Sequence, residues 1–224
     1  MVEEAVKRGG GKLLEHEAFA VLEAYGLPVP RYCLARDSSE AASCLERVGT
    51  PAVAKVVSPD VIHKSDVGGV ILGIKSVEEA ERAFNEISRS LAAHKPDARL
   101  VGVLYQQMVP EGLEVIVGSR RDQTFGPVLL FGLGGVLVEA IRDVSIRVAP
   151  IEPCEALDMV NDIRGRRLLE GYRGMPPRDK RALAGVILKI ARLMLDIPQV
   201  RELDLNPVMS YERGAAIADA RIIV

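Results

Sequence analysis

The chain has 224 residues, of which 48% are hydrophobic and 27% are charged, a composition typical of a folded globular protein. Because 29 lysine and arginine residues face 31 aspartate and glutamate residues, the formal charge of −2 argues against the basic surface of a nucleic-acid-binding protein. The longest apolar stretches are far shorter than the roughly 20 residues of a membrane-spanning helix, so we expect no membrane association.

The cysteines and the N-terminal segment bear on the compartment. Cys33, Cys44 and Cys154 are widely spaced and odd in number, so we expect neither a disulfide framework nor a cysteine-rich zinc site. Residues 1–12 carry acidic side chains and lack an apolar segment, which predicts that no signal peptide is present. Together these features predict a cytoplasmic protein.

The first half of the chain is predicted to mix helices and strands. Two helices have capping residues at their starts, Asp37 with Glu40 and Ser76 with Glu79. The apolar spacing predicts helices over 12–25, 38–48 and 77–93, and strands over 29–34, 52–57 and 70–75.

The second half is predicted to be richer in strands. The polar run 119–122 is expected to form a turn. Since helices and strands do not alternate strictly, the fold class is α+β rather than a doubly wound sheet, with a domain boundary near residue 100. Strands are expected over 100–108, 113–118, 128–131, 136–141, 145–149, 202–209 and 215–223, and helices over 153–163 and 178–195.

Glycine is abundant, with 20 residues, and it clusters at 68–69, 132–135 and 171–174. Glycine lets main-chain N–H groups approach an anion closely. None of these clusters forms a Walker loop or a complete dinucleotide fingerprint, and neither does 9–12. Each cluster alone is therefore more typical of a turn than of a ligand-binding loop.

The segment from His63 to Gly69 places four hydrogen-bonding side chains before two glycines, between two apolar strands. Such a loop can supply main-chain donors, a cation and a histidine that accepts a proton or a phosphoryl group. The alternative is a surface β-turn. Lys55 shares a strand face with Val53 and Val57, either as a cation for a bound phosphate or as a lysine on an edge strand.

Three oxygen-bearing side chains lie near the C-terminus. Asp204 and Asn206 are two residues apart and share a strand face, and Asp219 is expected on the next strand. Carboxylate and amide oxygens, completed by phosphate and water, are typical Mg²⁺ ligands. The alternative is an exposed, polar sheet face.

Six motifs carry a resemblance to a known family, and they occur in register along the chain. They are His63–Val70, Glu114–Gly118, Phe125–Pro127, Phe131–Gly135, Leu203–Pro207 and Asp219–Arg221. In this order and spacing they resemble the ATP-grasp (β) subunit of ADP-forming acetyl-CoA synthetases, also called acetate–CoA ligases, which are relatives of succinyl-CoA synthetase. The resemblance extends from about Leu14 to the C-terminus.

The resemblance implies an ATP-grasp fold, in which two α+β lobes with antiparallel sheets grip the nucleotide. The small lobe would be 21–103, and the large lobe would combine 1–20 with 104–224. The implied activity is that of an acid–CoA ligase: acyl-CoA, ADP and phosphate give free acid, ATP and CoA, reversibly. It proceeds through an acyl phosphate and a phosphohistidine loop of an α subunit.

The resemblance also implies roles for particular residues. Lys55, Gly68 and Gly69 would contact the phosphates of ATP or ADP. The main chain around Gln107 and Val109 would read the adenine edge, and Glu114 would bind the ribose. Asn206 and Asp219 would hold Mg²⁺, Asp204 would face the incoming phosphohistidine, and His63 would be a second phosphoryl carrier.

Fused members of the family carry CoA-binding domains that we do not expect in this chain. The resemblance therefore implies an α subunit with those domains and the phosphohistidine loop, in an α₂β₂ assembly. Two alternatives stay open: another ATP-grasp ligase that forms an acyl phosphate, and a non-catalytic nucleotide-binding regulatory subunit.

Overall fold

The structure is a computed structural model that describes residues 2–7, 11–61, 63–135 and 143–224. Its contacts divide the chain into two compact units, each with its own sheet. The combination of helices and antiparallel sheets confirms the predicted α+β class. The larger unit comprises Met1–Leu13, Ala18–Val29 and Pro110–Val224, and the smaller unit comprises Leu14–Glu17 and Pro30–Val109.

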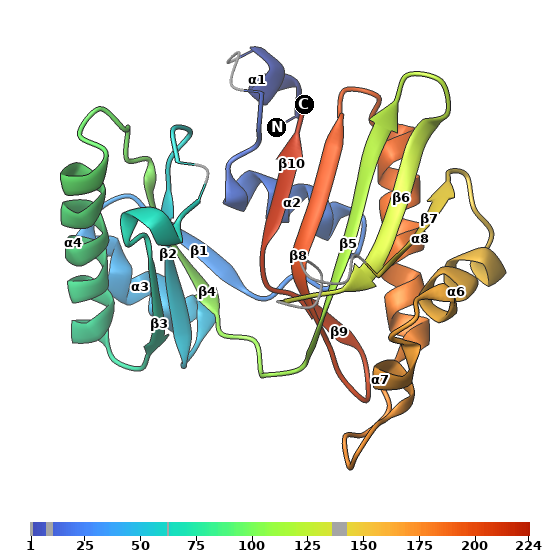
Figure 1. Ribbon diagram of the computed structural model, residues 1–224. Coiled ribbons are helices and arrows are strands. Elements are labelled where there is room, and N and C mark those ends of the chain that lie inside the picture. Colours follow the sequence, from blue (N-terminus) through green and yellow to red (C-terminus); the bar gives the residue numbers. More distant parts are fainter. Residues whose placement is uncertain (1, 8–10, 62, 136–142) are drawn as a thin grey trace. The chain divides into compact units, whose positions relative to one another are not determined.

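The smaller unit is a four-stranded antiparallel sheet with two helices on one face (Figure 1). The strand order is β1-β4-β2-β3. The strands are β1 (Tyr32–Ala35), β2 (Ala52–Val57), β3 (Val70–Ile74) and β4 (Gly102–Gln107); the helices are α3 (Ala41–Val48) and α4 (Val77–His94), with short 3₁₀ turns η1 (Ser38–Glu40) and η2 (Ser65–Val67).

Strand β2 lies at the centre of this unit. It pairs with β3 on one side and β4 on the other, and all six of its residues are buried. Ala52, Ala54 and Val56 belong to the core formed with α3 and α4. By strand alternation, Lys55 lies on the opposite face.

The predicted helix starts are confirmed in part. The Asp37 carboxylate accepts the Glu40 N–H, but the Glu40 carboxylate takes the N–H of Arg36 instead of that of Asp37. A 3₁₀ turn therefore precedes α3. At α4, Ser76 accepts the N–H of Glu79, as expected of a cap.

The larger unit contains a six-stranded antiparallel sheet in the order β10-β8-β5-β6-β7, with β9 paired to β8. Helix α8 packs against β5 and β6, and α6 packs against α8 (Figure 1). The strands are β5 (Leu113–Asp122), β6 (Gly126–Leu133), β7 (Val144–Val148), β8 (Glu202–Ser210), β9 (Ala215–Ile217) and β10 (Ala220–Ile223); the helices are α1 (Val2–Lys7), α2 (Glu15–Ala24), α6 (Pro153–Asp162), α7 (Arg166–Glu170) and α8 (Lys180–Asp196).

The two faces of this sheet differ. Val115 and Val117 of β5 and Leu203 and Leu205 of β8 are at most 1% exposed, as expected for the face that packs on the helices. The alternate residues, among them Asp204, are more exposed. This second face carries the candidate site residues of the larger unit.

Two predicted elements of the larger unit were wrong. Residues 119–122 belong to β5, and the turn follows them, where the Asp122 carboxylate accepts the N–H groups of Thr124 and Phe125. Polar side chains do not end this strand, because one of its faces is open. The strand predicted over 215–223 divides into β9 and β10, and the one over 136–141 lies outside the described residues.

The cysteine prediction was also wrong. Cys33 of β1 and Cys44 of α3 form a disulfide, and Cys154 is free and exposed. An odd cysteine count does not exclude one bond, and the strand-to-helix connection brings these two residues together. Among the described residues, no helix has both the length and the apolar character needed to cross a lipid bilayer.

Candidate functional site

Three charged side chains meet beside β2 in the smaller unit. Lys55 Nζ lies 2.7 Å from Glu15 Oε1, and Lys64 Nζ lies 2.9 Å from Glu15 Oε2. The Glu15 and Lys55 side chains are 4% and 9% exposed, and that of Lys64 is 21% exposed. We name these three residues the lysine–glutamate cluster. Charged side chains that are buried to this extent in proteins are generally paired with an opposite charge.

The position of Lys55 excludes one of its two predicted interpretations. Since β2 has a neighbour on both sides, Lys55 is not on an edge strand. Its register partners are Val70 of β3 and Leu104 of β4. A cation held by a carboxylate on a central strand is suited to contact an anion that approaches this face.

The loop that follows His63 is fastened to β2. Gly69 O accepts the Val56 N–H at 2.7 Å, and Gly69 N–H donates to Lys64 O at 2.8 Å. A Cβ at Gly69 would lie 2.3 Å from Val56 Cγ1, so only glycine allows this approach. Gly68 has a left-handed φ of 61°, which also favours glycine.

The same loop uses its own donors internally. The Gly68 N–H donates to Ser65 O at 3.1 Å, and the Gly69 N–H is taken by Lys64. In this arrangement, neither N–H is directed to an external anion. The His63 side chain is exposed, so it is accessible at the start of the loop.

The end of β4 carries the residues predicted to read adenine. The Gln107 N–H donates to Arg31 O at 2.8 Å, and the Met108 N–H donates to Pro51 O at 3.0 Å. The Gln107 side chain accepts from Arg31 Nε at 3.3 Å. These two main-chain donors are therefore engaged within the smaller unit, and Val109 follows them.

Two glycines lie close to Glu114, at the start of β5. Its carbonyl accepts the Gly134 N–H at 2.7 Å. A Cβ at Gly134 would lie 2.8 Å from Glu114 Cβ, and one at Gly135 would lie 3.0 Å from Glu114 Oε2. The glycines at 134 and 135 thus let the chain pass close to the Glu114 side chain.

Asn206 and Asp219 lie opposite each other in the larger sheet. The register of β8 and β10 pairs Leu205 with Ala220, and the Ala218 N–H donates to Pro207 O at 2.9 Å. Continuing this pairing by one residue sets Asp219 against Asn206. Opposed residues of antiparallel strands have Cβ atoms roughly 4.5–5.5 Å apart, so the two side chains can share a ligand.

Their oxygen donors fit a hard cation such as Mg²⁺. In the described ranges, no group of three or more His, Cys, Asp or Glu side chains is arranged to hold a metal ion. The Asn206–Asp219 pair would therefore supply part of a coordination shell, with phosphate and water oxygens supplying the rest.

Asp204 stands on the same sheet face, in register with Arg221 of β10. Arg221 Nη2 lies 3.9 Å from Asp204 Oδ2 and 2.7 Å from Glu202 Oε1. Burial raises the pKa of Asp204; Arg221 opposes this, while Glu202 and Asp219 add to it.

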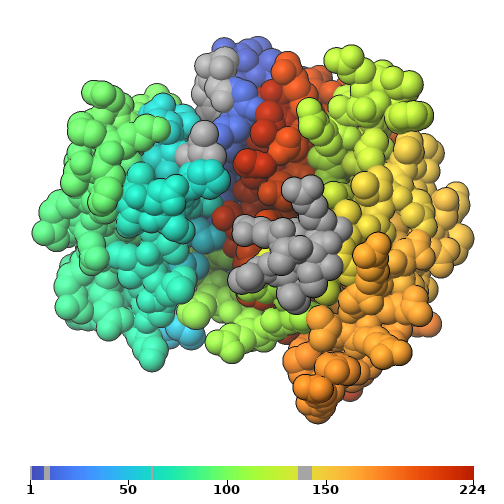
Figure 2. All heavy atoms as spheres, viewed as in Figure 1, coloured from blue at the N-terminus to red at the C-terminus, as the bar shows by residue number. Residues whose placement is uncertain are grey.

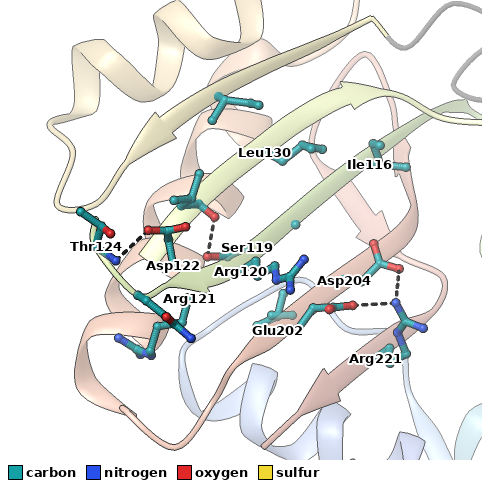
Figure 3. A pocket seen from close by; sticks show the side chains of 15 residues that line it. Ile116, Ser119, Arg120, Arg121, Asp122, Thr124, Leu130, Glu202, Asp204 and Arg221 are labelled. Carbon is teal, nitrogen blue, oxygen red and sulfur yellow. Dashed lines mark hydrogen bonds and ion pairs between the residues drawn. The ribbon is translucent and has the colours of Figure 1, made fainter. Parts of the chain in front are cut away.

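A cavity of about 860 Å³ opens on this face of the larger sheet (Figure 3). Asp204 and Arg221 lie at one end, and Thr124 and Asp122 lie at the other. Arg120 and Leu130 contribute from β5 and β6. The C-terminal strands also reach the molecular surface in the space-filling view (Figure 2, red). The cavity can receive a segment that brings both charged and apolar groups.

Glu15 and Arg221 were not predicted as site residues. Glu15 lies at the start of an amphipathic helix, where acidic residues are common, so no sequence signal marked it. Arg221 belonged to a recognised motif but had no assigned role. Both become visible only when the sheet and helix contacts are known.

Comparison with known proteins decides the family. The model of the ATP-grasp domain matches residues 4–224. The acetate–CoA ligase [ADP-forming] I subunit beta of Pyrococcus furiosus is 46% identical over 221 residues, covering 99% of this chain and 95% of that subunit. The chain belongs to the ATP-grasp family, among the β subunits of ADP-forming acetate–CoA ligases.

In another family member, the matching part is one section of a longer protein. The acetate–CoA ligase [ADP-forming] I of Archaeoglobus fulgidus is 47% identical over 221 residues. The match covers 99% of this chain but 32% of that ligase, so the chain spans about a third of its length.

Solved structures of an acetyl-coenzyme A synthetase 1 from Ca. Korarchaeum cryptofilum match the whole fold. The complex with coenzyme A, Ca-AMPCP and HgCl⁺ has a TM-score of 0.95 and 42% identity, covering 99% of this chain and 96% of that chain. A complex with coenzyme A and Mg-AMPPCP, in which the phosphohistidine segment points towards the nucleotide binding site, has a TM-score of 0.88 and 41% identity, with coverage of 99% and 96%.

Proposed function

We propose that this chain is the nucleotide-binding β subunit of an ADP-forming acyl-CoA synthetase. The observation that carries the proposal is the similarity, over 99% of the chain, to a β subunit of that class. The complete enzyme would convert acyl-CoA, ADP and phosphate into free acid, ATP and CoA, reversibly. The step on this chain is phosphoryl transfer between ADP and a phosphohistidine of the α subunit: the N–P bond breaks and a bond to a terminal oxygen of ADP forms.

The phosphates are assigned to Lys55, Gly68 and Gly69. Phosphoryl transfer depends on positioning and charge neutralisation, and Lys55 is a buried cation held in place. Because both glycine N–H groups donate within the loop, they contact phosphate only after the loop exchanges those hydrogen bonds.

The adenosine is assigned to Gln107, Val109 and Glu114. Since the N–H groups of Gln107 and Met108 are engaged, the adenine would be read through Val109 and through main-chain carbonyls. Glu114, beside Gly134 and Gly135, would accept hydrogen bonds from the ribose hydroxyls. The proposed division into two lobes, 21–103 and 1–20 with 104–224, is supported by the presence of two compact units, but the structure assigns Leu14–Glu17 to the smaller unit and Ala18–Val29 to the larger one.

The metal site is assigned to Asn206 and Asp219, whose register supports a shared ligand. Mg²⁺ bound there would neutralise negative charge on the phosphates. Asp204 would accept a hydrogen bond from the incoming imidazole and orient it, and Arg221 would steady that carboxylate. His63, exposed at the start of its loop, would serve as a second phosphoryl carrier.

The other parts of the active enzyme would be supplied by a partner subunit. We assign CoA binding and the phosphohistidine loop to an α subunit, in an α₂β₂ assembly in the cytoplasm. One relative is named a subunit beta, and another is a longer ligase of which this chain matches about a third. Both support the presence of a separate α subunit.

Isotope exchange between ADP and ATP, measured with this chain and its phosphorylated partner, tests the function. Exchange that requires both chains is expected. If both chains bind each other and the nucleotide but no exchange occurs, the chain is a regulatory subunit and the catalytic proposal is wrong.

A further inference from the structure

We propose that Glu15 is a positioning residue for the phosphate chain of the nucleotide: it holds the ammonium groups of Lys55 and Lys64 next to each other. The inference rests on the function proposed above. It adds a residue that lies outside every motif of the sequence analysis and that need not touch the nucleotide.

The geometry assigns one carboxylate oxygen to each lysine. Oε1 lies 2.7 Å from Lys55 Nζ, and Oε2 lies 2.9 Å from Lys64 Nζ. Because both oxygens belong to one carboxylate, Glu15 holds the two ammonium groups near each other. Two cations held in this way can each contact a phosphoryl group of a nucleotide.

The three residues come from separate parts of the smaller unit. Glu15 begins α2, whose first residues, Glu15–Glu17, belong to the smaller unit. Lys55 lies in β2, and Lys64 precedes η2. The carboxylate therefore links the strand and the glycine loop through their side chains, in addition to the main-chain bond between Val56 and Gly69.

Charge balance explains why the link is useful. Two ammonium groups this close repel each other, and Lys55 is largely removed from water. One carboxylate between them offsets part of this repulsion and orders both ammonium groups before binding, which lowers the ordering cost of binding phosphate.

A role of this kind predicts a change in selectivity for phosphate rather than a general loss of binding. The test compares the affinities of the intact chain for Mg-ADP and for adenosine by calorimetry, with adenosine measured by competition. Glu15→Gln should reduce the preference for ADP over adenosine about tenfold, as expected when charge-assisted contacts are lost. The affinity for adenosine should stay within about twofold.

The matched control is Glu17→Gln. Glu17 is a carboxylate in the same helical turn that accepts the Leu14 N–H at 2.9 Å, and its replacement should leave the ADP preference unchanged. In a Lys55→Gln/Lys64→Gln background, Glu15→Gln should cause little further loss, because Glu15 acts through these two lysines.

Glu15→Asp covers the case in which Glu15→Gln does not fold. It keeps the charge, but its shorter side chain cannot reach both lysines, so the ADP preference should again fall. An equal loss for ADP and adenosine, an equal effect of Glu17→Gln, or a full additional loss in the Lys55→Gln/Lys64→Gln background would overturn the inference. Failure of the wild-type chain to bind Mg-ADP would instead refute the proposed function.

Discussion

The Val56 N–H donates a 2.7 Å hydrogen bond to the carbonyl of Gly69, which fastens the loop that begins at His63 to the strand that carries Lys55. Val56 points into the core of the smaller unit, and its neighbour Lys55 lies on the opposite face. Through this one bond, the position of the loop depends on the packing of β2.

Replacing Gly69 should therefore disturb both stability and binding. The Cβ in Gly69→Ala would lie 2.3 Å from Val56 Cγ1, so the loop must move away from β2. We expect a loss of about 1–3 kcal/mol in the free energy of unfolding, measured by urea denaturation, together with weaker binding of Mg-ADP.

Gly185→Ala is the matched control, because a Cβ at that position of α8 meets nothing within 4 Å. An alanine inside a helix should stabilise the chain by about 0.5–1 kcal/mol. If both substitutions changed stability alike, the close approach of Gly69 to β2 would not explain its presence.

Much of the fold could be predicted from the sequence because its signals are local. The apolar run of β2 and the start of α4 at Ser76 were found correctly. The polar end of β5 was assigned to a turn, since an open sheet face carries the same residue types as a loop. Whether a polar segment pairs with β8 depends on contacts distant in sequence.

In the candidate site, too, local patterns could be predicted from the sequence and contacts between distant residues could not. Asp204, Asn206 and Asp219 were grouped from their spacing, and the strand register supports that grouping. The partners of Lys55 could not be predicted, because Glu15 is 40 residues away in sequence. The disulfide was missed because the number of cysteines does not reveal which two meet.

The raised pKa of Asp204 predicts how its replacement affects stability. Burial raises this pKa, so the folded chain binds the Asp204 proton more tightly than the unfolded chain does. The resulting stability is present in acid and is lost as the pH rises through the folded pKa, from about pH 4 upward. Asp204→Asn, which resembles the protonated form, should therefore be more stable than wild type at pH 7 and nearly equal to it at pH 3.

Thermal unfolding of the wild-type chain and of Asp204→Asn from pH 3 to pH 7 checks whether the variant is the more stable of the two at neutral pH. Phosphoryl transfer by Asp204→Asn should nevertheless fall about 10²-fold, because the imidazole of the partner is no longer held in place. A variant that is less stable than wild type only near pH 7 would show that Arg221 outweighs burial at this site.

Asp219→Ala should raise the Mg²⁺ concentration that the reaction requires. With one oxygen ligand removed, the Mg²⁺ concentration for half-maximal phosphoryl transfer should rise at least about tenfold, while the unfolding transition remains cooperative. Glu212→Gln is the control, since Glu212 is an exposed acidic residue between β8 and β9. An unchanged Mg²⁺ requirement in Asp219→Ala would exclude Asp219 as a ligand.

The bond between Cys33 and Cys44 should stabilise the smaller unit. It closes a loop with a sequence separation of 11 residues, for which the chain-entropy relation gives about 3 kcal/mol. Unfolding with and without a reductant should differ by roughly 2–3 kcal/mol, and the Cys33→Ser/Cys44→Ser variant should be insensitive to the reductant. Cys154→Ser should retain the full difference; a wild-type chain with no difference would indicate that the bond does not form in solution.

Phosphoryl transfer between a partner's histidine and ADP, as proposed for this chain, can be followed in a single-turnover experiment. An α subunit carrying a ³²P-labelled phosphohistidine is mixed with this chain, Mg²⁺ and ADP. We expect the label to appear in ATP with the wild-type chain, and about 10²–10³-fold more slowly with Lys55→Gln. If the label stays on the α subunit while this chain binds both ADP and the partner, the proposed transfer is wrong.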